Sequence, residues 1–238
     1  MRPFVRSLLL GLLLTLAGAL GDAGAQAPAP PPAVIEGNIY SVIYVEVMPT
    51  SAADGVALLK RYREATRKED GNLRCEVVQR IGQPHQLVVV AAWKDQATFE
   101  AHRKGATETD MREKIAAIRN APTDERVHTG LAVGPIDAKP AMGAVYVVTH
   151  VDVIPPRKDD GVAAVKQLAD DSRKGDGNLR FEVVQQTNRP NHFTVVEIWK
   201  DAKAIDVHSM AATTRLFRDK LAPATGALYD ERMYKAVD

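Results

Sequence analysis

The stretch GNLRCEVVQ at residues 71–79 returns as GNLRFEVVQ at residues 177–185, with one difference in nine positions. The offset of 106 residues (177 minus 71) holds without gaps along much of the chain. It pairs Tyr40 with Tyr146, Trp93-Lys94-Asp95 with Trp199-Lys200-Asp201, His102 with His208, and Asp124-Glu125-Arg126 with Asp230-Glu231-Arg232. Solenoid repeats have periods of about 20–50 residues, so this longer period indicates a duplicated domain. We expect the two copies to pack against each other as a covalently linked dimer.

The N-terminal segment lies outside the repeat. Arg2 and Arg6 precede a short apolar run, which small residues ending in Ala23-Gly24-Ala25 follow. This order is typical of a cleaved secretory signal peptide, whereas a transmembrane anchor needs a longer apolar run. The following prolines favour an extended tether. We therefore predict a signal peptide over residues 1–25, a tether over residues 26–38, a periplasmic or secreted mature protein, and no stable membrane insertion.

The composition disfavours several classes of protein. The net charge of +1 offers no electrostatic reason to bind nucleic acid or an anionic membrane. The chain has no glycine-rich phosphate loop, no Cys/His cluster with metal-ligand spacing and no Gly-x-Ser-x-Gly motif, so we expect no metal site. The single cysteine, Cys75, is replaced by Phe181 in the second copy, which predicts a buried apolar role.

Each copy has the pattern strand, helix, strand, strand, helix, strand. Runs of β-branched residues, helical spacing and Gly/Pro turns support this order, and Asp95 and Asp201 are expected to cap the second helices. The order βαββαβ is the ferredoxin-like topology. We expect first strands at 41–47 and 145–153, and third strands at 86–93 and 192–199. One such sheet carries helices on a single face, so we predict an α+β chain whose two ferredoxin-like domains, 39–135 and 143–238, cover each other.

The candidate site is a Trp and a His that recur in both copies. Trp93 and His102 are nine residues apart, as are Trp199 and His208. Each Trp closes a strand, and each His lies about two turns into the next helix, so the rings are expected to face each other between sheet and helix. Such an imidazole would position a phenol or quinol and accept its proton. The alternative is a core histidine bonded to the backbone beside a core Trp.

Asn72 and Asn178 recur with the same spacing to these rings. Both follow a glycine, where Asn is also a routine turn residue. A role in orienting a substrate and a role in the turn therefore both remain open. His150 replaces Tyr44 in the equivalent strand, so the two copies are expected to differ chemically.

Charged residues also recur on the strands. Glu76 and Glu182 occupy equivalent positions, as do Arg126 and Arg232. We expect these carboxylates and guanidinium groups to form ion pairs that hold the copies together.

The second copy resembles the antibiotic biosynthesis monooxygenase family, whose fold is a dimeric α+β barrel. The resemblance rests on GNLRFEVVQ, a short hairpin, VVEIWKD and then His208, and it covers both copies from Ile39 onward. The family's usual Glu-x-Trp matches Glu197 and Trp199, whereas Ala91 stands at that place in copy one. The positions that match family active sites are His208, Trp199, Asn178, His102, Trp93 and Asn72.

The resemblance implies a cofactor-independent monooxygenase that acts on a quinol or similar electron-rich aromatic and on molecular oxygen, and the predicted signal peptide implies that it is exported. The family's haem-degrading branch needs an Asn on the first strand, where this chain has Ile43 or Tyr44 and Thr149 or His150. A haem-binding relative is therefore the less favoured alternative, and we expect no cofactor. The alternative is a non-enzymatic periplasmic ligand-binding or scaffold protein of the same fold.

Overall fold

The structure, a computed structural model, describes residues 37–136 and 143–237. The predicted signal peptide at 1–25 and nearly all of the predicted tether at 26–38 lie outside these residues. Within them, no helix combines the length and the apolar character that a membrane crossing needs.

The two copies have the same order of elements. Copy one contains β1 (Ile39–Glu46), α1 (Ala52–Thr66), β2 (Asn72–Arg80), β3 (Gln86–Trp93), α2 (Gln96–Arg103), α3 (Ala106–Ile118) and β4 (Asp124–Ala132). Copy two contains β5 (Val145–Asp152), α4 (Lys158–Ser172), β6 (Asn178–Gln186), β7 (His192–Trp199), α5 (Ala202–Met210), α6 (Ala212–Leu221) and β8 (Asp230–Ala236). Short 3-10 turns precede α1 and α4 at Pro49–Ser51 and Pro155–Arg157, and a third follows α6 at Ala222–Ala224.

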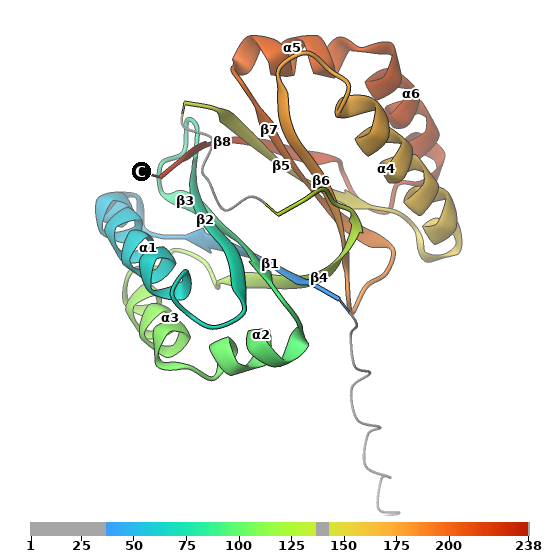
Figure 1. The fold of residues 1–238 in the computed structure, drawn as a ribbon. Coiled ribbons are helices and arrows are strands. Elements are labelled where there is room, and N and C mark those ends of the chain that lie inside the picture. Colours follow the sequence, from blue (N-terminus) through green and yellow to red (C-terminus); the bar gives the residue numbers. More distant parts are fainter. Residues whose placement is uncertain (1–36, 137–142, 238) are drawn as a thin grey trace, which may run out of the picture. The chain divides into compact units, whose positions relative to one another are not determined.

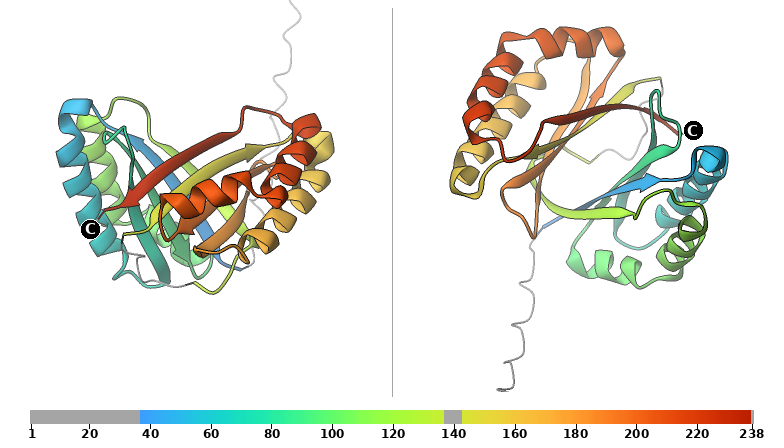
Figure 2. Two further views of the ribbon diagram at one scale, coloured as in Figure 1. Left: turned by 90° about the horizontal axis from the view of Figure 1, so that it is seen from above. Right: turned by 180° about the vertical axis from the view of Figure 1, so that it is seen from behind.

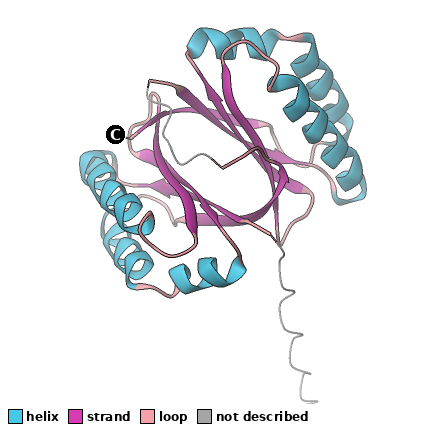
Figure 3. Ribbon diagram, in the orientation of Figure 1, coloured by secondary structure: helices cyan, strands magenta, loops and turns pink. Residues whose placement is uncertain are grey.

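The strands form one closed antiparallel barrel in the order β1-β3-β2-β8-β5-β7-β6-β4 (Figure 3). The last strand of each copy joins the two sheets: β4 pairs with β1 of its own copy and with β6 of the other, and β8 pairs with β5 of its own copy and with β2 of the other. The helices of each copy cover only the outer face of that copy's strands (Figure 1). The two helical layers therefore lie on opposite sides of the barrel (Figure 2). The predicted intramolecular dimeric α+β barrel is confirmed.

Successive side chains of each strand point alternately toward the helices and into the barrel, which produces separate outer and inner cores. In β1, Ile39, Ile43 and Val45 face the helices and belong to the apolar core of copy one. Val42, on the opposite face, joins a core cluster that also contains Val148 and other residues of copy two. Successive strand residues point to opposite faces, so a period of two builds an outer core under each helical layer and one shared core inside the barrel.

Cys75 is fully buried in the outer core of copy one, as its replacement by Phe181 predicts. Burial raises the pKa of the Cys75 thiol to about 12. The thiol is therefore protonated at neutral pH, which is the unreactive form.

The second helix of each copy differs from the prediction of one continuous helix. In copy one α2 ends at Arg103, and α3 begins after Gly105. In copy two α5 ends at Met210, and Ala211 adopts an extended conformation before α6. The predicted caps are confirmed, because Asp95 accepts a hydrogen bond from Thr98 N at 2.9 Å and Asp201 accepts one from Ala204 N at 2.8 Å. The break places the end of α2 or α5, with its His, over the end of the third strand.

A buried ion cluster joins the copies inside the barrel. The Arg74 side chain has no exposed surface, and its guanidinium donates to both carboxylate oxygens of Glu182 at 2.9 and 2.6 Å. Arg180 makes the equivalent contacts to Glu76, which also accepts a hydrogen bond from the Tyr146 hydroxyl at 3.1 Å.

The expectation that Arg126 and Arg232 bind these glutamates is wrong. Arg126 instead binds Asp124 at 2.7 Å, and Arg232 binds Asp230 at 2.7 Å. Residues i and i+2 of a strand share a face, so each of these arginines finds a carboxylate on its own strand. The glutamates do hold the copies together, but through arginines of the repeated GNLR motif.

We expect light scattering on the chain without residues 1–25 to give the mass of one chain. A closed barrel has no free strand edge to pair with another molecule, and each sheet already covers the other. A dominant homodimer would contradict this expectation, because it would show that each copy takes its partner from a second chain.

Candidate functional site

The Trp and His residues meet between sheet and helix in both copies. In copy one the Trp93 and His102 rings have centroids 4.4 Å apart, and in copy two the Trp199 and His208 rings are stacked at 4.5 Å. Both Trp side chains are buried, with 1% of their surface exposed. In each copy the end of the third strand, the Asp cap and the short helix after it hold the Trp and His rings in this arrangement.

The asparagines lie beside the same Trp residues. Asn72 is paired with Trp93 across β2 and β3, and Asn178 with Trp199 across β6 and β7. Each register shifts immediately after the asparagine, and each amide donates to the carbonyl two residues along at 3.4 Å. The structure therefore brings Asn next to Trp, while the amide hydrogen bond serves the local backbone.

In copy one, His102 is held by acidic groups on both sides. Its Nδ1 lies 2.6 Å from Glu69 Oε2, and its Nε2 lies 2.9 Å from the Tyr62 hydroxyl and 3.4 Å from Glu108 Oε2. Burial lowers the pKa of His102, but hydrogen bonds to Glu108 and Glu69 outweigh it, and the pKa lies above its ordinary value. The imidazole is thus held toward its protonated form, with both nitrogens engaged.

In copy two, His208 lacks these partners. Its Nε2 lies 3.5 Å from Glu197 Oε2, and its Nδ1 lies 3.4 Å from the Thr214 hydroxyl. Burial, together with the positive charge of Arg218, lowers the pKa of His208 to about 4. His208 is therefore neutral at pH 7 and carries a lone pair that can accept a proton.

Glu197 is the residue that distinguishes the site of copy two. It is buried, and its Oε2 accepts the Trp199 indole hydrogen bond at 2.8 Å. Burial raises the pKa of Glu197 to about 8, against the opposing effect of the Trp199 bond. The 3.5 Å contact with His208 thus joins two neutral groups and is not an ion pair. In copy one Ala91 replaces Glu197, and Trp93 Nε1 has no partner among the described residues.

Sequence reasoning missed Tyr62, Glu69 and Glu108. Their counterparts at the 106-residue offset are Leu168, Gly175 and Thr214. A position-by-position comparison of the two copies shows these three differences. It does not show that all three surround one imidazole, because that depends on how α1, α2 and α3 pack.

The family's sequence model, described as "Antibiotic biosynthesis monooxygenase", matches residues 38–114 and again residues 144–220. The two matches cover well over half of the chain. The chain belongs to the antibiotic biosynthesis monooxygenase family. Both matched segments contain the Asn, the Trp and the His described above.

Individual relatives of this monooxygenase-family chain are distant. "Putative monooxygenase YcnE" of Bacillus subtilis (strain 168) is 24% identical over 68 residues, which are 29% of this chain and 72% of the relative. A putative monooxygenase from Fusobacterium nucleatum superposes with a TM-score of 0.73 at 16% identity, over 85% of this chain and 93% of that one. One from Lactobacillus acidophilus has a TM-score of 0.69 at 13% identity, over 85% and 95%. At these identities the solved structures show a shared tandem fold. The roles of individual residues are therefore inferred from the contacts that those residues make in this chain.

Proposed function

We propose that this family member is an exported, cofactor-independent monooxygenase that oxidises a quinol or similar electron-rich aromatic in copy two. The observation that carries the proposal is the neutral His208 stacked on Trp199 at 4.5 Å, beside a protonated Glu197. The order of charged, apolar and small residues in 1–25 supports export.

The proposed chemistry needs only the substrate and oxygen. A quinol and O₂ give a hydroxyquinone and water, so the substrate supplies all the electrons and no external reductant is required. His208 would accept the phenolic proton as the ring passes an electron to oxygen, because an imidazole with a pKa of about 4 does not deprotonate a phenol beforehand. Trp199 would form a wall of the site, Glu197 would hold the indole, and the buried surroundings would limit water.

Copy one is proposed to be the weaker or inactive site. A general base must be deprotonated before it acts, and the acidic partners of His102 favour its protonated form. The arrangement of His102 with Tyr62 and Glu108 fits a structural hydrogen-bond network.

The second candidate is a non-enzymatic ligand-binding or scaffold protein. It is favoured by the 1% exposure of both Trp residues and by the use of the Asn72 and Asn178 amides in local backbone bonds. Under this alternative the recurring residues are retained for packing. Aerobic oxygen uptake with a panel of quinols separates the candidates, because a scaffold protein consumes no oxygen above the uncatalysed rate.

We expect His208→Ala to lower quinol-dependent oxygen uptake by about 10²–10⁴-fold, because a general base contributes about that factor. His102→Ala is the matched control, and we expect it to leave uptake within a few fold of the parent protein. The pH profile gives a second measurement. With His208 as the base, kcat/KM falls only as the pH drops through about 4, where that imidazole becomes protonated.

Three results would contradict the assignment. A folded His208→Ala protein with unchanged oxygen uptake would remove His208 from the mechanism. An acid limb above pH 6.5 that disappears in His102→Ala would move the chemistry to copy one, where the pKa of the histidine is raised. If both variants mainly lose stability, by about 1–3 kcal/mol for an unsatisfied buried group, the scaffold alternative is favoured.

A further inference from the structure

Copy two contains a second cluster of titratable side chains, away from the Trp199 site. His150 and Asp152 lie on β5, and His192 begins β7, where it is paired with Asp152. One ligand atom from each of the three side chains can be chosen so that all lie within 4.8 Å of one another. His150 shares its strand face with Val148 of the shared core, so the cluster lies at one end of the barrel interior rather than under the helices.

From this geometry we propose that His150, Asp152 and His192 bind one divalent transition-metal ion such as Zn²⁺. His150 Nε2 lies 3.2 Å from His192 Nδ1, and His192 Nε2 lies 3.4 Å from Asp152 Oδ1. Two ligands of a tetrahedral zinc ion with bonds of about 2.0–2.1 Å are about 3.3 Å apart. His192 can give only one of its nitrogens to the ion, so one side chain has to rotate before all three residues can bind the same ion.

The ligand types fit this class of ion. Imidazole suits zinc, copper, iron and nickel, and two histidines with one carboxylate are a common donor set that leaves positions open. An imidazole binds a metal ion through the lone pair of a neutral ring nitrogen.

The surrounding space lets an ion and its water ligands enter. A pocket of about 390 Å³ is lined by all three residues and by Asp124, Glu125, Arg126, Gln186, Asn188 and Arg189. The side chains of His192 and Asp152 are 13% and 16% exposed. His150 Nδ1 is buried and has no hydrogen-bond partner among the described residues.

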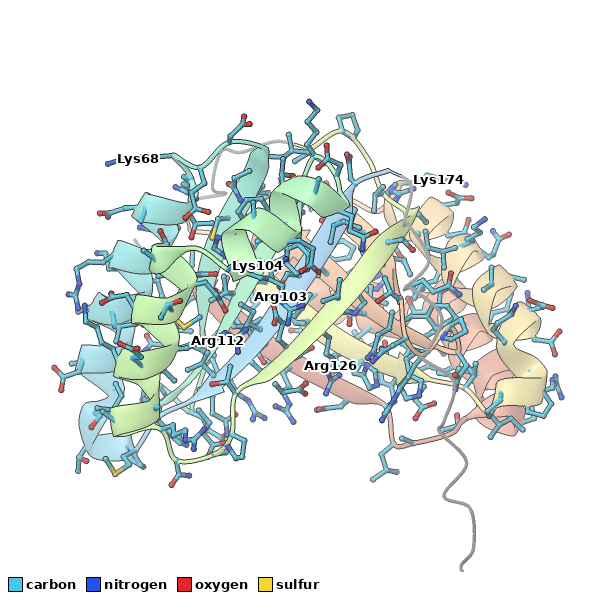
Figure 4. The ribbon with its side chains drawn as sticks, turned by 90° about the horizontal axis from the view of Figure 1, so that it is seen from below. Lys68, Arg103, Lys104, Arg112, Arg126 and Lys174 are labelled. Atoms are coloured by element: carbon cyan, nitrogen blue, oxygen red, sulfur yellow. The ribbon has the colours of Figure 1, made fainter. Side chains whose placement is uncertain are left out.

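Two of the three carboxylates that line the pocket are paired with arginines, so Asp152 is the one available to a cation. Arg126 is paired with Asp124 at 2.7 Å, and Glu125 is bound by Arg112 at 2.8 Å and approached by Arg103 at 3.7 Å. Figure 4 shows Arg103 and Arg112 on the helices of copy one and Arg126 on β4.

Asp152 has a different environment. Within residues 37–136 and 143–237 its only ion-pair partner is His192. Arg189, the other cation that lines the pocket, is exposed on the β6–β7 hairpin, where solvent weakens its field. The negative charge of Asp152 is therefore available to a cation bound beside the two imidazoles.

Copy one shows which residues stand at the positions equivalent to the three proposed ligands. At the 106-residue offset the counterparts of His150, Asp152 and His192 are Tyr44, Glu46 and Gln86. There the Gln86 amide donates to Glu46 at 3.2 Å, and neither Tyr44 nor Gln86 supplies an imidazole. Copy one thus keeps the carboxylate and lacks both nitrogen ligands, so the proposed site exists in copy two alone.

The test is calorimetric titration of ZnCl₂ into the full chain, without a histidine tag and after treatment with EDTA. We expect one Zn²⁺ per chain and a melting temperature that rises with zinc. Changes to groups that merely support metal ligands cost about 10–100-fold in affinity, so loss of a ligand should cost at least about 100-fold. His192→Gln, Asp152→Asn and His150→Tyr should each show this loss.

Two controls keep the result interpretable. His192→Gln introduces the residue that copy one already accommodates at Gln86, so its melting temperature without zinc should match that of the parent chain. Glu46→Gln alters the matching carboxylate of copy one and should leave zinc affinity unchanged. The proposal is overturned if the full chain binds no zinc, or if His192→Gln or Asp152→Asn binds it as tightly as the parent. None of these measurements uses oxygen uptake, so the outcome is independent of the proposed monooxygenase activity.

Discussion

Arg74→Ala is expected to lower the free energy of unfolding by about 3–5 kcal/mol, because removing one partner of a buried ion pair leaves the other charge uncompensated. Arg74 has no exposed side-chain surface, and its two hydrogen bonds to Glu182 cross from copy one to copy two. Among the residues that the structure describes, the ion-pair contact left to Glu182 in the variant is the one with Arg180 at 3.6 Å. Chemical denaturation followed by circular dichroism measures the loss.

The duplication provides the matched control for Arg74. The Arg180 side chain is 13% exposed, so water can partly solvate the carboxylate that Arg180→Ala leaves behind. We expect a clearly smaller cost for Arg180→Ala. Arg74→Met combined with Glu182→Leu should recover much of the stability, because apolar replacement of a whole buried pair is often neutral or stabilising. A cost below about 1 kcal/mol for Arg74→Ala would show that the cluster does not hold the copies together.

Trp199→Ala is expected to cost about 3–5 kcal/mol, the usual price of deleting a buried aromatic side chain. Its indole is 1% exposed, stacks on His208 and donates to Glu197 at 2.8 Å. Thermal and denaturant unfolding measure this loss. An unchanged melting temperature would show that the ring is not part of the core.

Replacing each Trp by phenylalanine separates the contribution of ring packing to stability from that of the indole hydrogen bond. Trp199→Phe should fold but lose about 1–3 kcal/mol, because Glu197 is left without its donor. Trp93→Phe should cost less, since Trp93 Nε1 has no partner within the part of the chain that the structure describes. Equal costs at the two positions would show that the Glu197 bond contributes little to stability.

Much of the fold could be predicted from local patterns. The GNLR repeat showed the duplication, the β-branched run at residues 41–47 indicated a strand, and Asp95 marked the start of a helix. These signals act over a few residues, where strand period and capping geometry are nearly independent of the rest of the chain. The Trp-to-His spacing likewise placed each pair on a strand end and the following helix, which is why the stacking of Trp199 on His208 could be anticipated.

The sequence by itself thus determined the duplication, the βαββαβ order, the family and the meeting of each Trp with its His. Only the tertiary structure decided which charges pair and which histidines are neutral. Arg74 finds Glu182 108 residues away, and His150 meets His192 42 residues away. The pKa values of His102 and His208 diverge because side chains from other elements surround one imidazole and not the other. Such partners depend on strand register, on the pairing of β4 and β8 with the other copy and on helix packing, because hydrogen bonds and electrostatic interactions follow distance in space rather than along the chain.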